Sequence, residues 1–150
     1  IKGNWLWKSE LAHTKGLRTS SKPTDELSRN AILVGFDYGG ITNILLGIEY
    51  AVEDLHGLSK ATTENGQSDQ QLALRYSQSF VNEKWQLQAA ILSQKKASSS
   101  GSLMRVSLEY RPGNSVTYSM GAIIYAGDHD MPLGQLDDRD RITVGLSWYF

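Results

Sequence analysis

Apolar and polar residues alternate at every second position over most of this chain. The last ten residues, RITVGLSWYF, show the pattern most clearly, because Ile142, Val144, Leu146, Trp148 and Phe150 are apolar while the residues between them are polar or small. A period of two is that of a β-strand with one apolar face. Stretches with helical spacing are hard to find, so the sequence predicts an all-β protein.

The same alternation recurs along the chain and predicts eight strands. Most of them are near the ~9–11 residues with which a tilted strand crosses a bilayer. The expected strands cover residues 3–13, 30–39, 43–54, 70–80, 85–95, 103–111, 115–127 and 141–150.

The connections between these strands differ in length in a regular order. Long polar segments at 14–29, 56–69 and 128–140, and an intermediate one at 96–102, alternate with tight turns at 39–42, 81–84 and 111–114. An antiparallel up-and-down meander with long loops at one end and short turns at the other gives this order. Outer-membrane β-barrels have that asymmetry.

Composition narrows the class of protein without naming a function. The chain has 150 residues, which fits a single domain over 1–150 with no separate soluble domain, and its formal net charge is −1. No basic stripe favours nucleic acid, and the lack of cysteine excludes disulfides and thiolate metal sites. No apolar run is long enough for a membrane helix, but a membrane barrel hides its apolar residues at alternate positions.

The polar positions suit the interior of a membrane barrel better than a water-exposed surface. They are rich in Gly, Ser and Ala, with charges of both signs scattered among them. Charges in a crowded interior need partners, because an unpaired buried charge costs several kcal/mol. We therefore expect lipid outside and charged side chains lining the lumen, namely Lys8, Glu10, Asp37, Glu49, Arg75, Arg105, Glu109 and Arg141. A soluble barrel or sandwich is the alternative.

Aromatic residues gather where the short turns are expected. Tyr38 and Trp85 lie beside tight turns, and Trp148 and Phe150 fall at the same end of the meander. Together with Trp5 and Trp7 they predict a girdle at one membrane interface, where amphipathic rings prefer to lie.

The terminal RITVGLSWYF resembles the closing strand of outer-membrane β-barrel proteins of Gram-negative bacteria. In that class the last strand ends in a Phe that the barrel-assembly machinery reads, which implies an assembly role for Phe150 and a lipid-facing one for Trp148 and Phe150. A wider stretch, roughly 30–150 and including ILVGFDYGGITNILLGIEYAVEDL and GDHDMPLGQLDDRDRITVGLSWYF, is similar to the C-terminal region of porin-like outer-membrane barrels of proteobacteria. Those barrels are longer and poorly characterised. The resemblance implies either a complete small barrel or the C-terminal half of a larger one.

These observations predict a passive outer-membrane pore for small solutes, or the C-terminal part of one. Both termini would be periplasmic, because eight is an even number of strands. The expected partners are the lipid bilayer, lipopolysaccharide and the assembly machinery, with a homo-oligomer left open and no nucleic acid. A non-conducting eight-strand barrel that works through its loops, as an anchor or adhesion surface, is the first alternative.

A rim enzyme acting on lipid or peptide is the second alternative, and its candidate residues lie near the long loops. His13, His56 and His129 all fall at that end of the predicted meander, and Asp128 and Asp130 flank His129. Asp and His together could orient a water molecule. Neighbours on a strand point to opposite faces, however, and the acidic loop lacks the ligand spacing of an EF-hand. We expect no catalysis, no metal and no cofactor.

Overall fold

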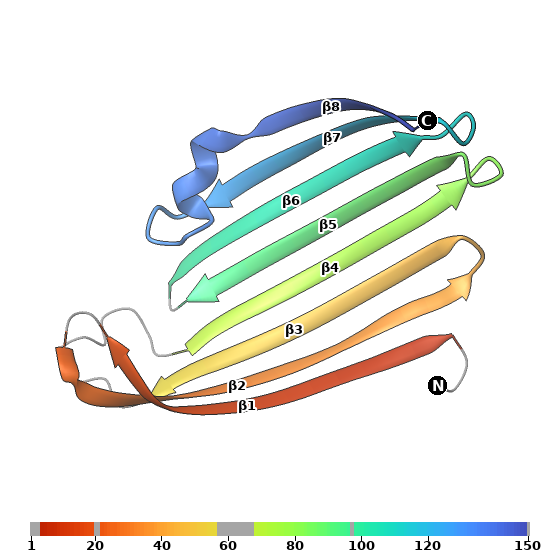
Figure 1. Ribbon diagram of the computed structural model, residues 1–150. Coiled ribbons are helices and arrows are strands. Elements are labelled where there is room, and N and C mark those ends of the chain that lie inside the picture. Colours follow the sequence, from red (N-terminus) through yellow and green to blue (C-terminus); the bar gives the residue numbers. More distant parts are fainter. Residues whose placement is uncertain (1–3, 20–21, 57–67, 97, 150) are drawn as a thin grey trace.

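Eight antiparallel strands form one sheet in the computed structural model, and their spatial order is their order in the chain (Figure 1). The structure describes residues 4–19, 22–56, 68–96 and 98–149. A 3-10 helix, η2 (Gly134–Arg139), lies between the last two strands. The strands are β1 (Trp5–Thr19), β2 (Lys22–Ile41), β3 (Ile44–His56), β4 (Ser68–Phe80), β5 (Trp85–Lys96), β6 (Ser99–Tyr110), β7 (Val116–Gly127) and β8 (Arg141–Trp148).

The predicted all-β, up-and-down architecture with eight strands is confirmed. Each strand pairs with its sequence neighbours, and the turns between β2 and β3, β4 and β5, and β6 and β7 lie at one end of the sheet (Figure 1). The described strands do not close into a ring: β1 and β8 are the two edges, and each pairs with one neighbour only. A closed barrel therefore stays a prediction.

The pairing register gives the sheet two faces of opposite character. Residues that pair directly across neighbouring strands lie on the same face, and the register places the even residues of β1 and β5 with the odd residues of the other six strands. We call this side the polar face. The remaining residues, which carry the apolar alternation seen in the sequence, form the apolar face.

The first hairpin is longer than the sequence indicated. Residues 14–29 were expected to be a loop, but β1 continues to Thr19 and β2 begins at Lys22, with Thr19 paired to Lys22. The prediction failed because a backbone hydrogen-bond ladder needs no apolar alternation to continue. The extension is irregular: the register shifts between Lys15 and Leu17, and Gly16 there has a φ of +75°, a conformation that glycine adopts without strain.

The predicted regularity of long and short connections is also wrong at a second place. Strands β5 and β6 are joined tightly, with Lys96 paired to Ser99, where an intermediate loop over 96–102 was expected. Among the described connections at that end of the sheet, only 128–140 is long. Most of the predicted loop 56–69 lies outside the described residues.

The connection over 128–140 is folded rather than extended. It contains η2, and Met131 and Gly134 within it are buried. A side chain at Gly101 would meet the Cβ atoms of Met131 and Leu133 at 3.2 Å. Because Gly101 belongs to the polar face, the β7–β8 connection lies against that face, which the sequence did not indicate.

The chain has almost no hydrophobic core. Among the described residues, Tyr125 and Met131 are the only buried hydrophobic side chains, and both lie at the β7–β8 connection. The accessible surface is 11002 Å², against about 7,600 Å² for a compact protein of this mass. No helix in the described part of the chain is both long and apolar enough to span a membrane. The strands are thus held mainly by one another's backbones.

Candidate functional site

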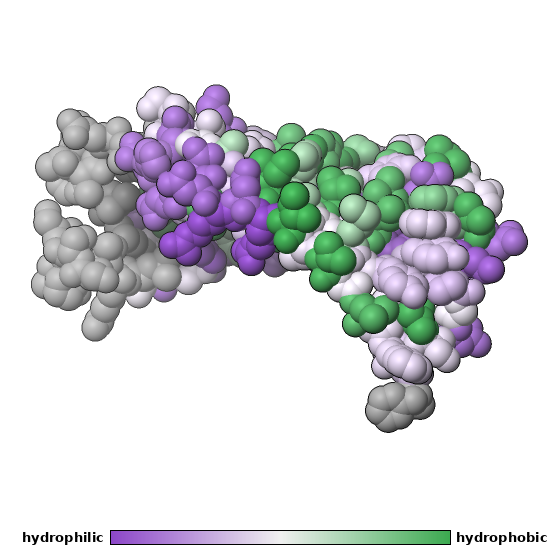
Figure 2. Space-filling view, turned by 90° about the horizontal axis from the view of Figure 1, so that it is seen from above, coloured by the Kyte–Doolittle hydropathy of each residue, from purple (hydrophilic) through white to green (hydrophobic). Residues whose placement is uncertain are grey.

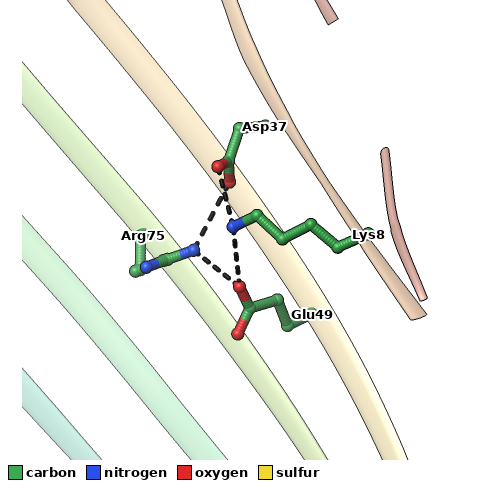
Figure 3. Close-up of polar contacts among 4 residues, drawn as sticks. All are labelled: Lys8, Asp37, Glu49 and Arg75. Carbon is green, nitrogen blue, oxygen red and sulfur yellow. Dashed lines mark hydrogen bonds and ion pairs between the residues drawn. The ribbon is translucent and has the colours of Figure 1, made fainter. Parts of the chain in front are cut away.

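Four charged side chains from four consecutive strands meet on the polar face. Lys8 of β1 lies between Asp37 of β2 and Glu49 of β3, with its Nζ 2.8 Å from Asp37 Oδ2 and 3.0 Å from Glu49 Oε1. Arg75 of β4 reaches the same two carboxylates, at 2.7 Å from Glu49 Oε1 and 3.4 Å from Asp37 Oδ1 (Figure 3). We call these four residues the ion-pair cluster. Each carboxylate therefore has two cationic partners, and each cation has two anionic ones.

Two glycines leave the space that the ion-pair cluster occupies. A Cβ atom at Gly47 would lie 2.7 Å from Asp37 Oδ1, and one at Gly35 would lie 2.7 Å from Glu49 Cγ. Both distances are shorter than real Cβ contacts allow, so any other residue would displace a carboxylate. In the sequence each glycine stands two positions before an acid, as GFD and GIE. This repeated spacing is a signal that sequence analysis missed.

The ion-pair cluster carries no net charge and is partly open to solvent. The exposed fraction of its side chains runs from 18% at Asp37 to 52% at Arg75. Partly exposed ion pairs stabilise modestly because water screens them. Their main effect is geometric, since they fix the long side chains of β1 to β4 against the sheet.

The other predicted lumen charges share the polar face but not the ion-pair cluster. Glu109 pairs with Arg111 at 2.6 Å. Arg141 Nη2 donates a hydrogen bond of 3.4 Å to the Tyr125 hydroxyl. Among the described residues, Glu10, Arg105 and Arg141 form no ion pair. The eight residues therefore lie on one face, as predicted, although only five of them are paired.

Two further ion pairs lie nearer the end of the sheet that carries the β7–β8 connection. Arg29 of β2 pairs with Glu53 of β3 at 3.4 Å, and Asp69 of β4 pairs with Lys96 of β5 at 3.7 Å. The register puts both pairs on the polar face. Charges of opposite sign thus balance each other along most of this face.

The β7–β8 connection is held against the polar face at both of its ends. Asp128 accepts a hydrogen bond of 2.7 Å from the Ser100 backbone N–H, and its own N–H donates to Ser100 O at 2.8 Å. Asp140 accepts a hydrogen bond of 2.8 Å from the Tyr125 backbone N–H. The connection therefore covers part of the polar face near the ends of β6 and β7.

The apolar face carries a continuous band of exposed hydrophobic side chains. Exposed fractions reach 79% at Leu11, 76% at Trp7 and 84% at Val144. In Figure 2 hydrophobic residues occupy the middle of the visible surface, and hydrophilic ones gather toward the end with the β7–β8 connection. The register puts the charged residues of the described apolar face, Lys15, Asp54 and Lys95, at that same end. No charged residue interrupts the described band itself.

The length of this band is set by the apolar residues along each strand. In β3 it runs from Ile44 to Val52 at every second position, a rise of about 27 Å along the strand. A strand tilt of about 40° would reduce this to about 21 Å across the membrane, close to the ~25 Å apolar band of outer-membrane barrels.

Aromatic rings form a row across the apolar face at the short-turn end. Phe80, Trp85, Tyr110 and Tyr118 come from four neighbouring strands, and successive ring centroids are 6.2, 4.4 and 6.2 Å apart. A second group lies on β1 and β2, where Trp5 is 4.3 Å from Tyr38 and 5.7 Å from Phe36. Trp148 follows on β8, opposite Val116. The predicted aromatic residues that the structure describes therefore lie on the apolar face, but only Trp85 belongs to the four-ring row.

The histidines do not come together into a site. His13 lies on β1 beside Asn30, His56 ends β3, and His129 follows β7 at the far side of the sheet. Asp128, the weak catalytic candidate next to His129, is engaged with the backbone of Ser100. Among the described residues, no group of three or more His, Asp or Glu side chains could hold a metal ion. Phe150, the predicted assembly signal, lies outside the described residues.

Comparison with protein-family models, with curated proteins and with solved structures found no match to this chain. The proposed function therefore rests on the two faces of the sheet.

We expect the ion-pair cluster to show a coupling energy that salt weakens. In a double-mutant cycle of Arg75→Gln and Glu49→Gln, the coupling should be about 0.5–1 kcal/mol at low salt. It should fall steeply near 1 M salt, where the Debye length is about 3 Å. Urea unfolding of the protein refolded in detergent micelles measures each free energy.

A matched cycle of Arg75→Gln with Glu10→Gln is the control. It changes the same residue types on the same face, and Glu10 has no described ion pair, so its coupling should be near zero. Equal coupling energies in the two cycles would contradict the geometry of the ion-pair cluster.

Proposed function

We propose that this chain forms the wall, or part of the wall, of a passive pore for small solutes in the outer membrane of a Gram-negative bacterium. The observation that carries the proposal is the division of the sheet. One face carries a band of exposed apolar side chains that no charge interrupts, and the other holds charged side chains within its strands. A lipid exterior suits the first face, and a water-filled lumen suits the second.

A membrane would cover the exposed apolar face, which is unfavourable in water. Exposed apolar patches on soluble proteins rarely exceed a few hundred Å², yet here the apolar face of every described strand is open. Lipid would cover that face without any further protein layer. The aromatic row at the short-turn end then lies where rings prefer to be, at a membrane interface.

Under this proposal the partners are the bilayer, lipopolysaccharide and the barrel-assembly machinery, and the short turns face the periplasm. The anchor alternative has one observation in its favour, because the β7–β8 connection lies against the polar face and would narrow a lumen. The enzyme alternative draws no support from the separated histidines.

Substitutions at two neighbouring residues of β7 test which face of the sheet contacts lipid. Met120 lies at the centre of the apolar band of β7, and Ser119 lies on the polar face opposite Glu109. An arginine at a lipid-facing midplane position costs about 2–4 kcal/mol. Met120→Arg should lower the unfolding free energy in lipid vesicles by about that amount, whereas Ser119→Arg should change it by less than about 1 kcal/mol.

Both variants add the same side chain to the same strand, so they control for each other. Intrinsic tryptophan fluorescence during urea unfolding of vesicle-bound protein measures both. If Ser119→Arg lowered the unfolding free energy more than Met120→Arg did, the polar face would be the one that contacts lipid. The proposed orientation of the sheet would then be wrong.

Conductance tests the pore itself. The refolded full chain, added to a planar lipid bilayer, should produce stepwise ohmic currents, and Glu49→Lys should change their size because the side chain faces the lumen. Lys95→Glu reverses a charge on the apolar face and should leave the step size unchanged. Protein that inserts and folds but passes no current would favour the anchor alternative.

A further inference from the structure

Three arginines lie in one transverse row on the polar face. Arg75, Arg105 and Arg141 are connected through direct cross-strand pairs, with Ala90 between the first two and Ile123 between the last two. They come from β4, β6 and β8, so every second strand contributes one. The row crosses the interior of β4 and β6 and meets β8 at its first residue, Arg141.

The charges in this row are not balanced equally. The two carboxylates of the ion-pair cluster offset Arg75 and Lys8. Arg105 and Arg141 have no carboxylate within salt-bridge distance among the described residues. Elsewhere on the described strands of this face, Arg29 and Lys96 are each paired with an acid, and so is Arg111, which directly follows β6. Positive charge therefore remains at Arg105 in the middle of β6 and at Arg141 at the start of β8.

A hollow of about 290 Å³ lies between Arg75 and Arg105. Space is left there because the residues that pair with Arg75 on either side, Gly47 and Ala90, are small. Ser77, Gln88 and Ser107, which pair in the next row, line its side. Arg105, two serines and a glutamine are therefore among the residues that line a space large enough for several non-hydrogen atoms.

These groups match the chemistry of an oxyanion. Guanidinium groups bind carboxylate and phosphate through paired N–H donors, and such charge-assisted bonds are about twice as strong as neutral ones. Serine hydroxyls and the glutamine amide can donate to the remaining oxygens. The one carboxylate that lines the hollow, Asp37, is already held by Lys8 and Arg75, so little uncompensated negative charge opposes an incoming anion.

We propose that this hollow is an anion-binding subsite of the pore wall, with Arg105 as its principal charge, and that the solutes it favours carry a carboxylate or phosphate group. The inference rests on the proposed pore and names the class of solute that the pore prefers. Arg141 extends the same row toward β8 and would pass the anion along the wall.

Ion selectivity of the refolded full chain in a planar bilayer tests the subsite. Under a potassium chloride gradient the wild type should favour chloride. Arg105→Gln should lower the chloride-to-potassium permeability ratio by about sevenfold, because the Boltzmann factor of one charge acting through water at roughly 7 Å is about 2.7 and acts in opposite directions on the two ions. Arg105→Lys should keep the ratio near the wild-type value. Lys95→Gln removes the same charge from the apolar face and should leave the ratio unchanged.

Block by inorganic phosphate gives a second readout at the same site. Phosphate added to one side should reduce the chloride current of the wild type, and Arg105→Gln should raise the half-blocking concentration at least about threefold. A pore that conducts with no anion preference, or one indifferent to Arg105→Gln, would overturn the subsite and leave the pore standing. A folded, inserted protein without conductance would overturn the pore and the subsite together.

Discussion

Backbone hydrogen bonding between neighbouring strands is the interaction on which this structure depends, because the chain buries almost no side chains. Only Tyr125 and Met131 are buried among the described hydrophobic residues. A soluble domain of this size normally gains its stability from a core on one face of its sheet. Here the apolar face remains open from β1 to β8. The fold must therefore gain stability from the medium or partner that covers this face. A bilayer meets this need and also penalises every unpaired backbone group. The two open edges, β1 and β8, therefore have to be paired for the fold to persist in lipid.

The polar face follows from the same constraint. If lipid covers the apolar face, as we propose, the charged side chains are confined to the other side, where each cation is best stabilised by a carboxylate within reach. The ion-pair cluster meets this requirement by means of Gly35 and Gly47, whose missing side chains leave room for Glu49 and Asp37. Arg105 stands apart from this balance, which is why it is the residue that we assign to solute binding.

Much of the fold could be predicted from the sequence, because a period of two reports directly on a two-faced strand. The pattern of Ile142 to Trp148 indicates β8 within two residues of its observed end. The extension of β1 and β2 could not be predicted in this way, since paired polar segments show no apolar alternation. The pairing partners within the ion-pair cluster depend on register, which the sequence does not specify. The β7–β8 connection lies against the polar face at Gly101, where the missing side chain leaves room for Met131. The sequence does not show that these two residues lie together.

Refolding of the chain with and without detergent tests most directly the claim that an apolar environment replaces the core. We expect a β-rich species in micelles, seen by circular dichroism, whose gel mobility changes on boiling. In buffer alone we expect aggregation or an unfolded chain. A folded, monomeric and soluble protein without detergent would contradict this claim, because the apolar face would then have to be covered by the chain itself.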